Sequence, residues 1–145
     1  DVTYPDLAAE RRMLYSTTGT EERRLETVMT GPELISVQRL VRQIPVPDKV
    51  VEAILSLVRS ARPGTGADAE VDRYVAWGPG PRASQALMLA VRAKALIDGR
   101  LAPSIDDVVA LAEPILKHRM ALKFAARADN QDLSGIIARL AAKAG

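Results

Sequence analysis

The sequence contains no cysteine and one histidine, so it offers neither a disulfide scaffold nor a zinc site made of thiolates and imidazoles. Aromatic residues are scarce as well, at 3% of the chain. No apolar run approaches the roughly 18 residues that cross a bilayer, and no positively charged and then apolar leader opens the chain. We therefore expect a cytoplasmic protein with no metal site and no membrane contact. Because the chain begins at Asp1 rather than Met, we also expect it to be a piece of a longer protein.

Charge is nearly balanced, with 20 Lys and Arg residues against 18 Asp and Glu residues and a net charge of +2. Proteins that bind nucleic acid through its phosphates usually carry a clustered excess of basic residues, so this balance argues against a nucleic-acid partner. The hydrophobic share of 48% consists mainly of Ala, Leu, Val and Ile, which favours aliphatic helix-on-helix packing. The length fits one domain of ordinary size. The composition thus predicts a single all-α domain over residues 1–145.

Hydrophobic residues recur at three- and four-residue steps in the first half of the chain, which is the spacing of a helix face. Pro5, at a first helical position where a missing N–H costs nothing, begins a predicted helix over about 5–17. A second predicted helix over about 32–44 ends at Pro45, because proline breaks the pattern. A third then runs over about 47–62.

The second half begins with a predicted loop at 63–70, after which 71–77 can be either a helical turn or an extended piece. The segment Gly78-Pro79-Gly80-Pro81 is the strongest helix breaker of the chain. The residues after it, up to Ile97, are almost wholly apolar. We expect this helix to be the central, buried one.

Two more helices complete the predicted bundle. Gly99 stands at a left-handed cap position, and Ser104 with an acidic residue three places on, Asp107, begins the next helix. Pro114 removes a ladder hydrogen bond within that helix and should kink or restart it just before the proline. A short last helix starts near Leu133. In all, the pattern predicts a bundle of six to seven helices.

Few residues are suited to catalysis. His118, the single histidine, lies near a helix C-terminus, where a cation is favourable, so we interpret it as a capping or packing residue before a catalytic one. Asp106 and Asp107 are neighbours, but adjacent residues on a helix point about 100° apart, and both fit a capping role in a first turn. The motif G-x-x-x-x-G-K-[ST] is absent, so the chain carries no phosphate-binding loop of its own.

Arg82 is a candidate phosphate contact. It follows Gly80 and Pro81 in the first turn of the apolar helix, where backbone N–H groups and the helix dipole already attract anions. A guanidinium there can bind phosphate through two parallel hydrogen bonds. A plain surface role is the commoner use of such an arginine, and the local sequence leaves both interpretations open.

A series of short segments, in a fixed order, covers nearly the whole chain. Its first members are YPD at 4–6, QRLVRQIPV at 38–46 and LVRSAR at 57–62. The later members are YVAWGPGPRAS at 74–84, DGR at 98–100, DDV at 106–108 and PILKHR at 114–119. Together they resemble the carboxy-terminal helical lid domain of MoxR-type AAA+ ATPases.

This resemblance implies a longer ATPase, in which an α/β nucleotide-binding core with Walker motifs binds ATP with Mg²⁺. It assigns Arg82 as the second sensor, the lid arginine that approaches the terminal phosphates and takes part in hydrolysis. Tyr4 and Pro5 match the hinge between core and lid, where AAA+ proteins commonly flank the adenine. The resemblance implies that the lid alone neither binds nor hydrolyses ATP.

The resemblance also implies partners. The lid would contact its own core and neighbouring subunits of a homo-oligomeric ring, and MoxR-type members are regarded as chaperone-like ATPases, often with von Willebrand A domain proteins. Residues 104–119 alone also resemble magnesium-chelatase ATPase subunits, whereas residues 38–46 favour the MoxR side. The alternative is a free-standing helical interaction or DNA-binding module, with the 46–58 hairpin or the Arg82 helix as its contact surface.

Overall fold

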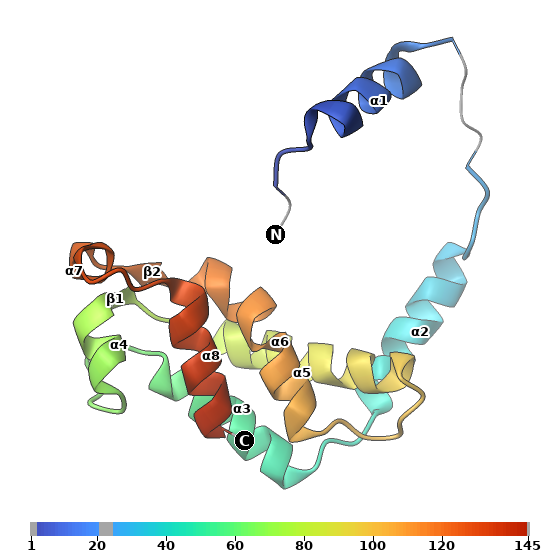
Figure 1. Cartoon of the computed structure of the whole chain (residues 1–145). Coiled ribbons are helices and arrows are strands. Elements are labelled where there is room, and N and C mark those ends of the chain that lie inside the picture. The colour runs from blue at the N-terminus through green and yellow to red at the C-terminus, as the bar shows by residue number, and fades with distance from the viewer. Residues whose placement is uncertain (1–2, 21–24, 145) are drawn as a thin grey trace. The chain divides into compact units, whose positions relative to one another are not determined.

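The computed structural model describes residues 3–20 and 25–144 (Figure 1). The chain divides into two compact units, Asp1–Leu34 and Ile35–Gly145. Within the described residues there are eight α-helices, one 3-10 helix and one two-stranded sheet, so the predicted all-α class is confirmed, with more helices than the six or seven expected. In chain order the elements are α1 (Leu7–Thr18), α2 (Gly31–Gln43), α3 (Asp48–Ser60), α4 (Ala69–Tyr74), β1 (Val75–Trp77), α5 (Pro81–Ile97), α6 (Ile105–Leu116), η1 (Lys117–Arg119), β2 (Ala121–Leu122), α7 (Phe124–Ala128) and α8 (Leu133–Ala144).

The first unit contains α1, whose N-cap is Asp6. The carboxylate of Asp6 accepts a hydrogen bond from the backbone N–H of Ala9 at 2.7 Å, so Asp6 is the N-cap. The expectation that Pro5 opens the helix is therefore wrong, because Pro5 precedes the cap. No residue of α1 is buried.

Helix α2 starts with a capping interaction between Thr30 and Glu33. The backbone N–H of Thr30 donates to the Glu33 carboxylate at 2.7 Å, and hydrogen bonds from Thr30 hold the pKa of Glu33 below its ordinary value. Like α1, α2 has no buried residue. Burial begins at Ile44, directly after the helix, and α3 starts after its N-cap Pro47, as the proline pattern predicts.

Helices α3, α5, α6 and α8 build the core of the second unit, with α6 packed against each of the other three. The largest fully buried side chains are Ile54, Leu57, Leu87, Leu116, Ile136 and Ile137. The expectation that α5 is the central helix is wrong. Only one stripe of α5 is buried, through Ala83, Leu87, Val91 and Ala95, whereas Ile97 at its end is 84% exposed. An apolar composition did not distinguish a helix buried all round from one with an uncovered outer face.

A small antiparallel sheet joins two distant parts of the chain. Val75 pairs with Leu122 and Trp77 with Ala121. The backbone N–H of Lys123 adds a hydrogen bond to the carbonyl oxygen of Tyr74 at 2.7 Å. The segment 71–77, which the sequence left open, is a helical turn followed by a strand. Neither β2 nor the short helix α7 is predicted by the sequence pattern.

Helix α6 continues through Pro114 and ends at Leu116. Of the two expected outcomes, a kink or a restart, the restart is therefore wrong, and the kink stays a prediction. Proline deprives the carbonyl group four residues earlier, that of Ala110, of its helical donor. Ala110 is exposed, so water can supply the missing hydrogen bond.

Candidate functional site

The N-terminus of α5 is positioned by a close approach between two chain segments. A Cβ atom at Gly78 would lie 2.3 Å from the carbonyl oxygen of Ala61 and 2.8 Å from the Cα of Arg62. Both distances are far inside van der Waals contact, so only glycine fits at this position. The glycine and proline segment before α5 is thus fixed against the end of α3.

Hydrogen bonds complete this anchor. The Nε of Arg62 donates to the carbonyl oxygen of Pro79 at 2.9 Å. Gly80 is the N-cap and Pro81 the first helical residue, as the sequence predicts. The backbone N–H of Ala83 donates to the carbonyl oxygen of Gly80 at 3.0 Å, and the Ala83 side chain is fully buried. These contacts therefore fix the first turn of α5 against the core.

Arg82, the predicted phosphate contact, is the second residue of α5 and is exposed. Because Ala83 faces the core and successive helical residues point about 100° apart, the Arg82 side chain faces outward. None of the described residues gives Arg82 a hydrogen bond or an ion pair. A permanently charged, planar guanidinium at a helix N-terminus is thus available to an anion.

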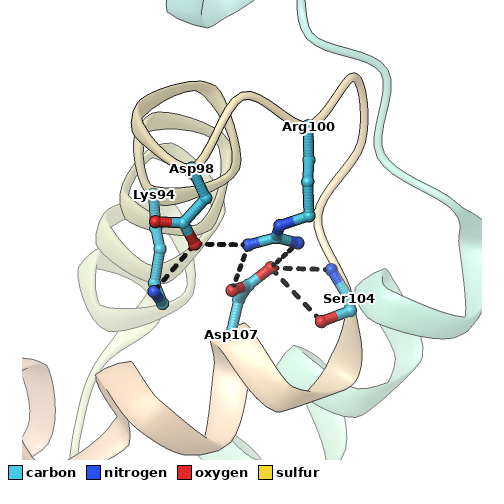
Figure 2. A network of polar contacts seen from close by, with 5 residues as sticks. All are labelled: Lys94, Asp98, Arg100, Ser104 and Asp107. Carbon is cyan, nitrogen blue, oxygen red and sulfur yellow. Dashed lines mark hydrogen bonds and ion pairs between the residues drawn. The ribbon is translucent and has the colours of Figure 1, made fainter.

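The other end of α5 is joined to α6 by a polar network that the sequence pattern does not predict (Figure 2). Arg100 donates to both carboxylate oxygens of Asp107, at 2.8 and 2.7 Å, and to Asp98 at 2.9 Å. Asp98 also accepts a hydrogen bond from the Nζ of Lys94 at 3.0 Å. The backbone N–H of Ser104 donates to Asp107 at 2.8 Å, which is the predicted capping interaction.

This network is structural rather than catalytic. Asp107 is only 2% exposed, and hydrogen bonds from Arg100 hold the pKa of its carboxyl below the ordinary value. Hydrogen bonds to Asp107 and then Asp98 raise the pKa of Arg100. Each charge is therefore stabilised by its partner, and the buried carboxylate ties the start of α6 to the end of α5.

The sequence did hold a signal for this network. Gly99 has a φ of 71°, as its predicted cap position requires, and this left-handed turn carries the next residue back toward α6. A cation directly after a glycine cap, followed by a capping carboxylate, is the pattern formed by Arg100 and Asp107. Local capping rules explain Gly99 and Asp107 separately, so they did not predict the ion pair between Arg100 and Asp107.

The two predicted hinge residues lie in the other unit. Tyr4 is 99% exposed and Pro5 is exposed as well, and both precede α1. Arg82 belongs to the second unit, Ile35–Gly145, and the hinge role of Tyr4 and Pro5 stays a prediction.

His118 lies in the 3-10 turn η1 and is exposed. Its Nε2 contacts the guanidinium of Arg119, which also donates to the carbonyl oxygen of Ile115 at 2.6 Å. Arg119 thus caps the end of α6, and His118 contacts the capping residue rather than the helix itself. The arrangement contains no nucleophile or carboxylate partner for the histidine among the residues described.

The described ranges, 3–20 and 25–144, hold neither a metal site nor a membrane-spanning helix. No group of three or more His, Asp or Glu residues there is placed to hold a metal ion. Nor does any helix in that part of the chain combine the length and the apolar character needed to cross a membrane. The exposed arginine of α5 therefore stands as the leading candidate.

Comparison with known proteins adds to this geometry. A family model described as the AAA lid domain matches residues 67–139. That range includes α5 with Arg82, the small sheet, and the network that joins α5 to α6. The match therefore covers the helix that carries the candidate arginine, whereas Ala61 and Arg62, which anchor the start of that helix, lie just before the matched range.

Two known proteins are similar over most of the chain. The chaperone MoxR1 of Mycobacterium tuberculosis (strain ATCC 25618 / H37Rv) is 30% identical over 130 residues, which are 89% of this chain and 34% of the chaperone. A 2.00 Å crystal structure of a candidate ATPase from Cytophaga hutchinsonii ATCC 33406 shares the fold, with a TM-score of 0.78 and 20% identity, over 96% of this chain and 43% of that one. The chain thus spans about a third of the length of the chaperone.

Proposed function

Since this chain belongs to the AAA lid domain family, as the lid of a MoxR-type AAA+ ATPase, we propose that it closes over ATP in the whole protein and that Arg82 acts there as the second sensor. The observation that carries the proposal is the placement of Arg82. A rigid anchor at Gly78 and Arg62 fixes the helix start, and the guanidinium is exposed without a partner among the described residues. Such an arginine is held in position for a ligand that another domain presents.

The chemistry of phosphoryl transfer suits this arrangement. The transferring phosphoryl group spreads negative charge over its oxygens, and catalysis consists mainly of placing fixed positive charge and hydrogen-bond donors against it. A guanidinium offers two parallel N–H donors and stays charged at every physiological pH. The positive end of the α5 dipole adds to its attraction for phosphate. Arg82 would therefore favour the closed lid while the terminal phosphate is present and release it after hydrolysis.

The rest of the proposal concerns the whole protein. We propose that residues 1–145 form the lid part of a cytoplasmic ATPase whose core binds ATP with Mg²⁺ through its Walker motifs. Tyr4 and Pro5 would form the hinge and contact the adenine. The lid would contact its own core and neighbouring subunits of a homo-oligomeric ring. Hydrolysis would drive remodelling or maturation of partner complexes, with von Willebrand A domain proteins as candidate partners.

The test is the steady-state ATPase rate of the full-length protein with Arg82→Ala. Loss of a preorganised donor to a developing oxyanion typically costs about 10²-fold or more in kcat, and we expect a loss of that size. Arg59→Ala is the matched control, because Arg59 is another exposed arginine, on α3, that the described residues leave unpaired. Equal turnover of the two variants would contradict the second-sensor role, and the interaction-module alternative would then be preferred.

A further inference from the structure

Helix α7 presents a cationic and aromatic surface to the outside of the second unit. The helix packs inward through Ala126, its one buried residue, whereas Phe124 is 83% exposed. Lys123, the N-cap, and Arg127, four residues on, lie on the same side of the helix. We call Lys123, Phe124 and Arg127 the α7 patch. Aromatic residues and arginine are enriched in protein interfaces, so the patch has the composition of a contact surface.

No carboxylate of the described residues neutralises the α7 patch. The Nζ of Lys123 donates to a backbone carbonyl oxygen, that of Asp72, at 2.7 Å. The side chain of Arg127 has no hydrogen-bond or ion-pair partner within 3–20 and 25–144. The nearest acid in the sequence, Asp129, is already paired with Arg73 at 2.6 Å. The patch is therefore complementary to carboxylates that a partner supplies.

Helix α3 carries a surface of the opposite charge. Asp48, Glu52 and Leu55 follow one another at spacings of four and three residues, so they share one face of the helix. All three are exposed, and neither carboxylate has a hydrogen-bond or ion-pair partner in the described part of the chain. Lys49, beside Asp48, points about 100° away from that side chain. We call Asp48, Glu52 and Leu55 the α3 patch.

Carboxylates without a partner are rare in the second unit. Among its described residues, every acid outside the α3 patch except Asp106 accepts a hydrogen bond or forms an ion pair. Asp106 is a single residue in the first turn of α6. The α3 patch is therefore the place in this unit where two such carboxylates lie on one helix face.

The two patches match in spacing. Each has two like charges four residues apart with an apolar side chain beside them, so two carboxylates can meet two cations while Phe124 packs on Leu55. Figure 1 shows α7 and the start of α3 at different ends of the second unit. Both helices belong to one packed unit, so the patches can meet only between two copies of the chain. A contact between different surfaces of identical chains repeats head to tail and can close into a ring.

We propose that, in the ring of the whole ATPase, the α7 patch of one subunit binds the α3 patch of the next, so that neighbouring lids touch directly. The inference rests on the homo-oligomeric ring of the proposed function and names a contact surface within it. Three residues a side cover far less than the roughly 800 Å² per partner of a standard interface. The contact therefore adds to the ring interface and does not by itself hold two lids together.

The experiment measures the mass of the full-length ATPase over a dilution series, with a slowly hydrolysed ATP analogue and Mg²⁺, by analytical ultracentrifugation. Arg127→Glu and Glu52→Arg each place like charges against each other, so each should raise the concentration for half-assembly about tenfold. The double variant carries the same pair with its signs exchanged and should assemble nearly as the unaltered protein does. Arg39→Glu is the matched control, because Arg39 is exposed, has no partner among the described residues and lies in neither patch.

The outcomes separate this contact from the proposed function. Unchanged assembly in both single variants, or no recovery in the double variant, would overturn the inference. An equal loss in Arg39→Glu would overturn it as well, because the effect would then be one of overall charge. A full-length protein that stays monomeric would contradict the proposed ring, and this contact with it. The second-sensor role is tested separately, by the ATPase rate of Arg82→Ala.

Discussion

The buried carboxylate of Asp107 allows a quantitative test of what holds α5 to α6. In Asp107→Asn the side chain keeps its size and one carbonyl oxygen, which can still accept the hydrogen bond from the backbone N–H of Ser104. The variant loses the negative charge that Arg100 contacts at 2.8 and 2.7 Å. The substitution therefore removes the ion pair and leaves most of the helix cap.

The expected cost follows from the geometry. Hydrogen bonds to charged groups contribute about 1.5 to 3 kcal/mol each. The Arg100 side chain is 36% exposed, so solvent screens part of the interaction. We expect Asp107→Asn to lower the free energy of unfolding by about 2 kcal/mol, and the melting temperature by about 6 °C.

The cost should also depend on pH. Arg100 holds the pKa of the Asp107 carboxyl below its ordinary value in the folded protein. The stability that this pair contributes is therefore fully present above the pKa of the unfolded chain and is lost as pH falls through the folded-state pKa. The difference between the unaltered chain and Asp107→Asn should be constant at neutral pH and shrink below about pH 4.

Urea unfolding followed by circular dichroism, at pH 7 and at acidic pH, measures both quantities. The control is Asp106→Asn, which changes an exposed carboxylate in the same helical turn and should cost about 0.5 kcal/mol through the helix dipole alone. The reasoning would be refuted by equal losses in the two variants at pH 7. A difference that persists undiminished well below pH 4 would refute the linkage argument.

Three further pairs of substitutions test other parts of the fold by thermal unfolding. Gly78→Ala should lower the free energy of unfolding by about 2 kcal/mol or more, because the added Cβ has no room beside the backbone at the end of α3. Gly80→Ala is the control and should be tolerated, because nothing lies within 4 Å of a Cβ at that position. Equal losses of stability in the two variants would contradict the close approach at Gly78. Ile137→Ala should cost about 3 kcal/mol through a cavity in the core, and Ile97→Ala on the exposed end of α5 less than about 0.5 kcal/mol. Asp68→Ala removes the N-cap of α4 and should cost about 1.5 kcal/mol, while Asp68→Asn, which keeps the cap, should cost less.

Periodicity predicted those helices whose folding depends on local pattern. The bounds of α3, α5 and α8 lie close to the expected ones, because their apolar stripes and flanking prolines or glycines act within a few residues. Strand β2 was not predicted, because its pairing with Val75 and Trp77 joins segments far apart in the sequence. Helix α7 is only five residues long, which is too short for a periodic signal.

The candidate site shows the same division. The cation in the first turn of α5 could be predicted, because Gly80, Pro81 and Arg82 are consecutive. The contact that fixes this turn against the core could not be predicted, because it joins Gly78 to the backbone of Ala61 at the end of another helix, α3. A groove between α2 and α5, lined by Arg42, Gln85 and Met88 among others, was not predicted for the same reason, because its walls come from helices separated by α3, α4 and β1.

The contact between α3 and α8 has a consequence for how the protein is made. These helices come from the two ends of the second unit's sequence, and α8 supplies Ile136, Ile137, Leu140 and Ala141 to the shared core. On the ribosome, α3, α5 and α6 can pack against one another as they emerge, but the apolar side chains that α8 covers stay exposed until α8 has been synthesised. Until then the nascent unit has to depend on speed of synthesis or on a chaperone to avoid aggregation.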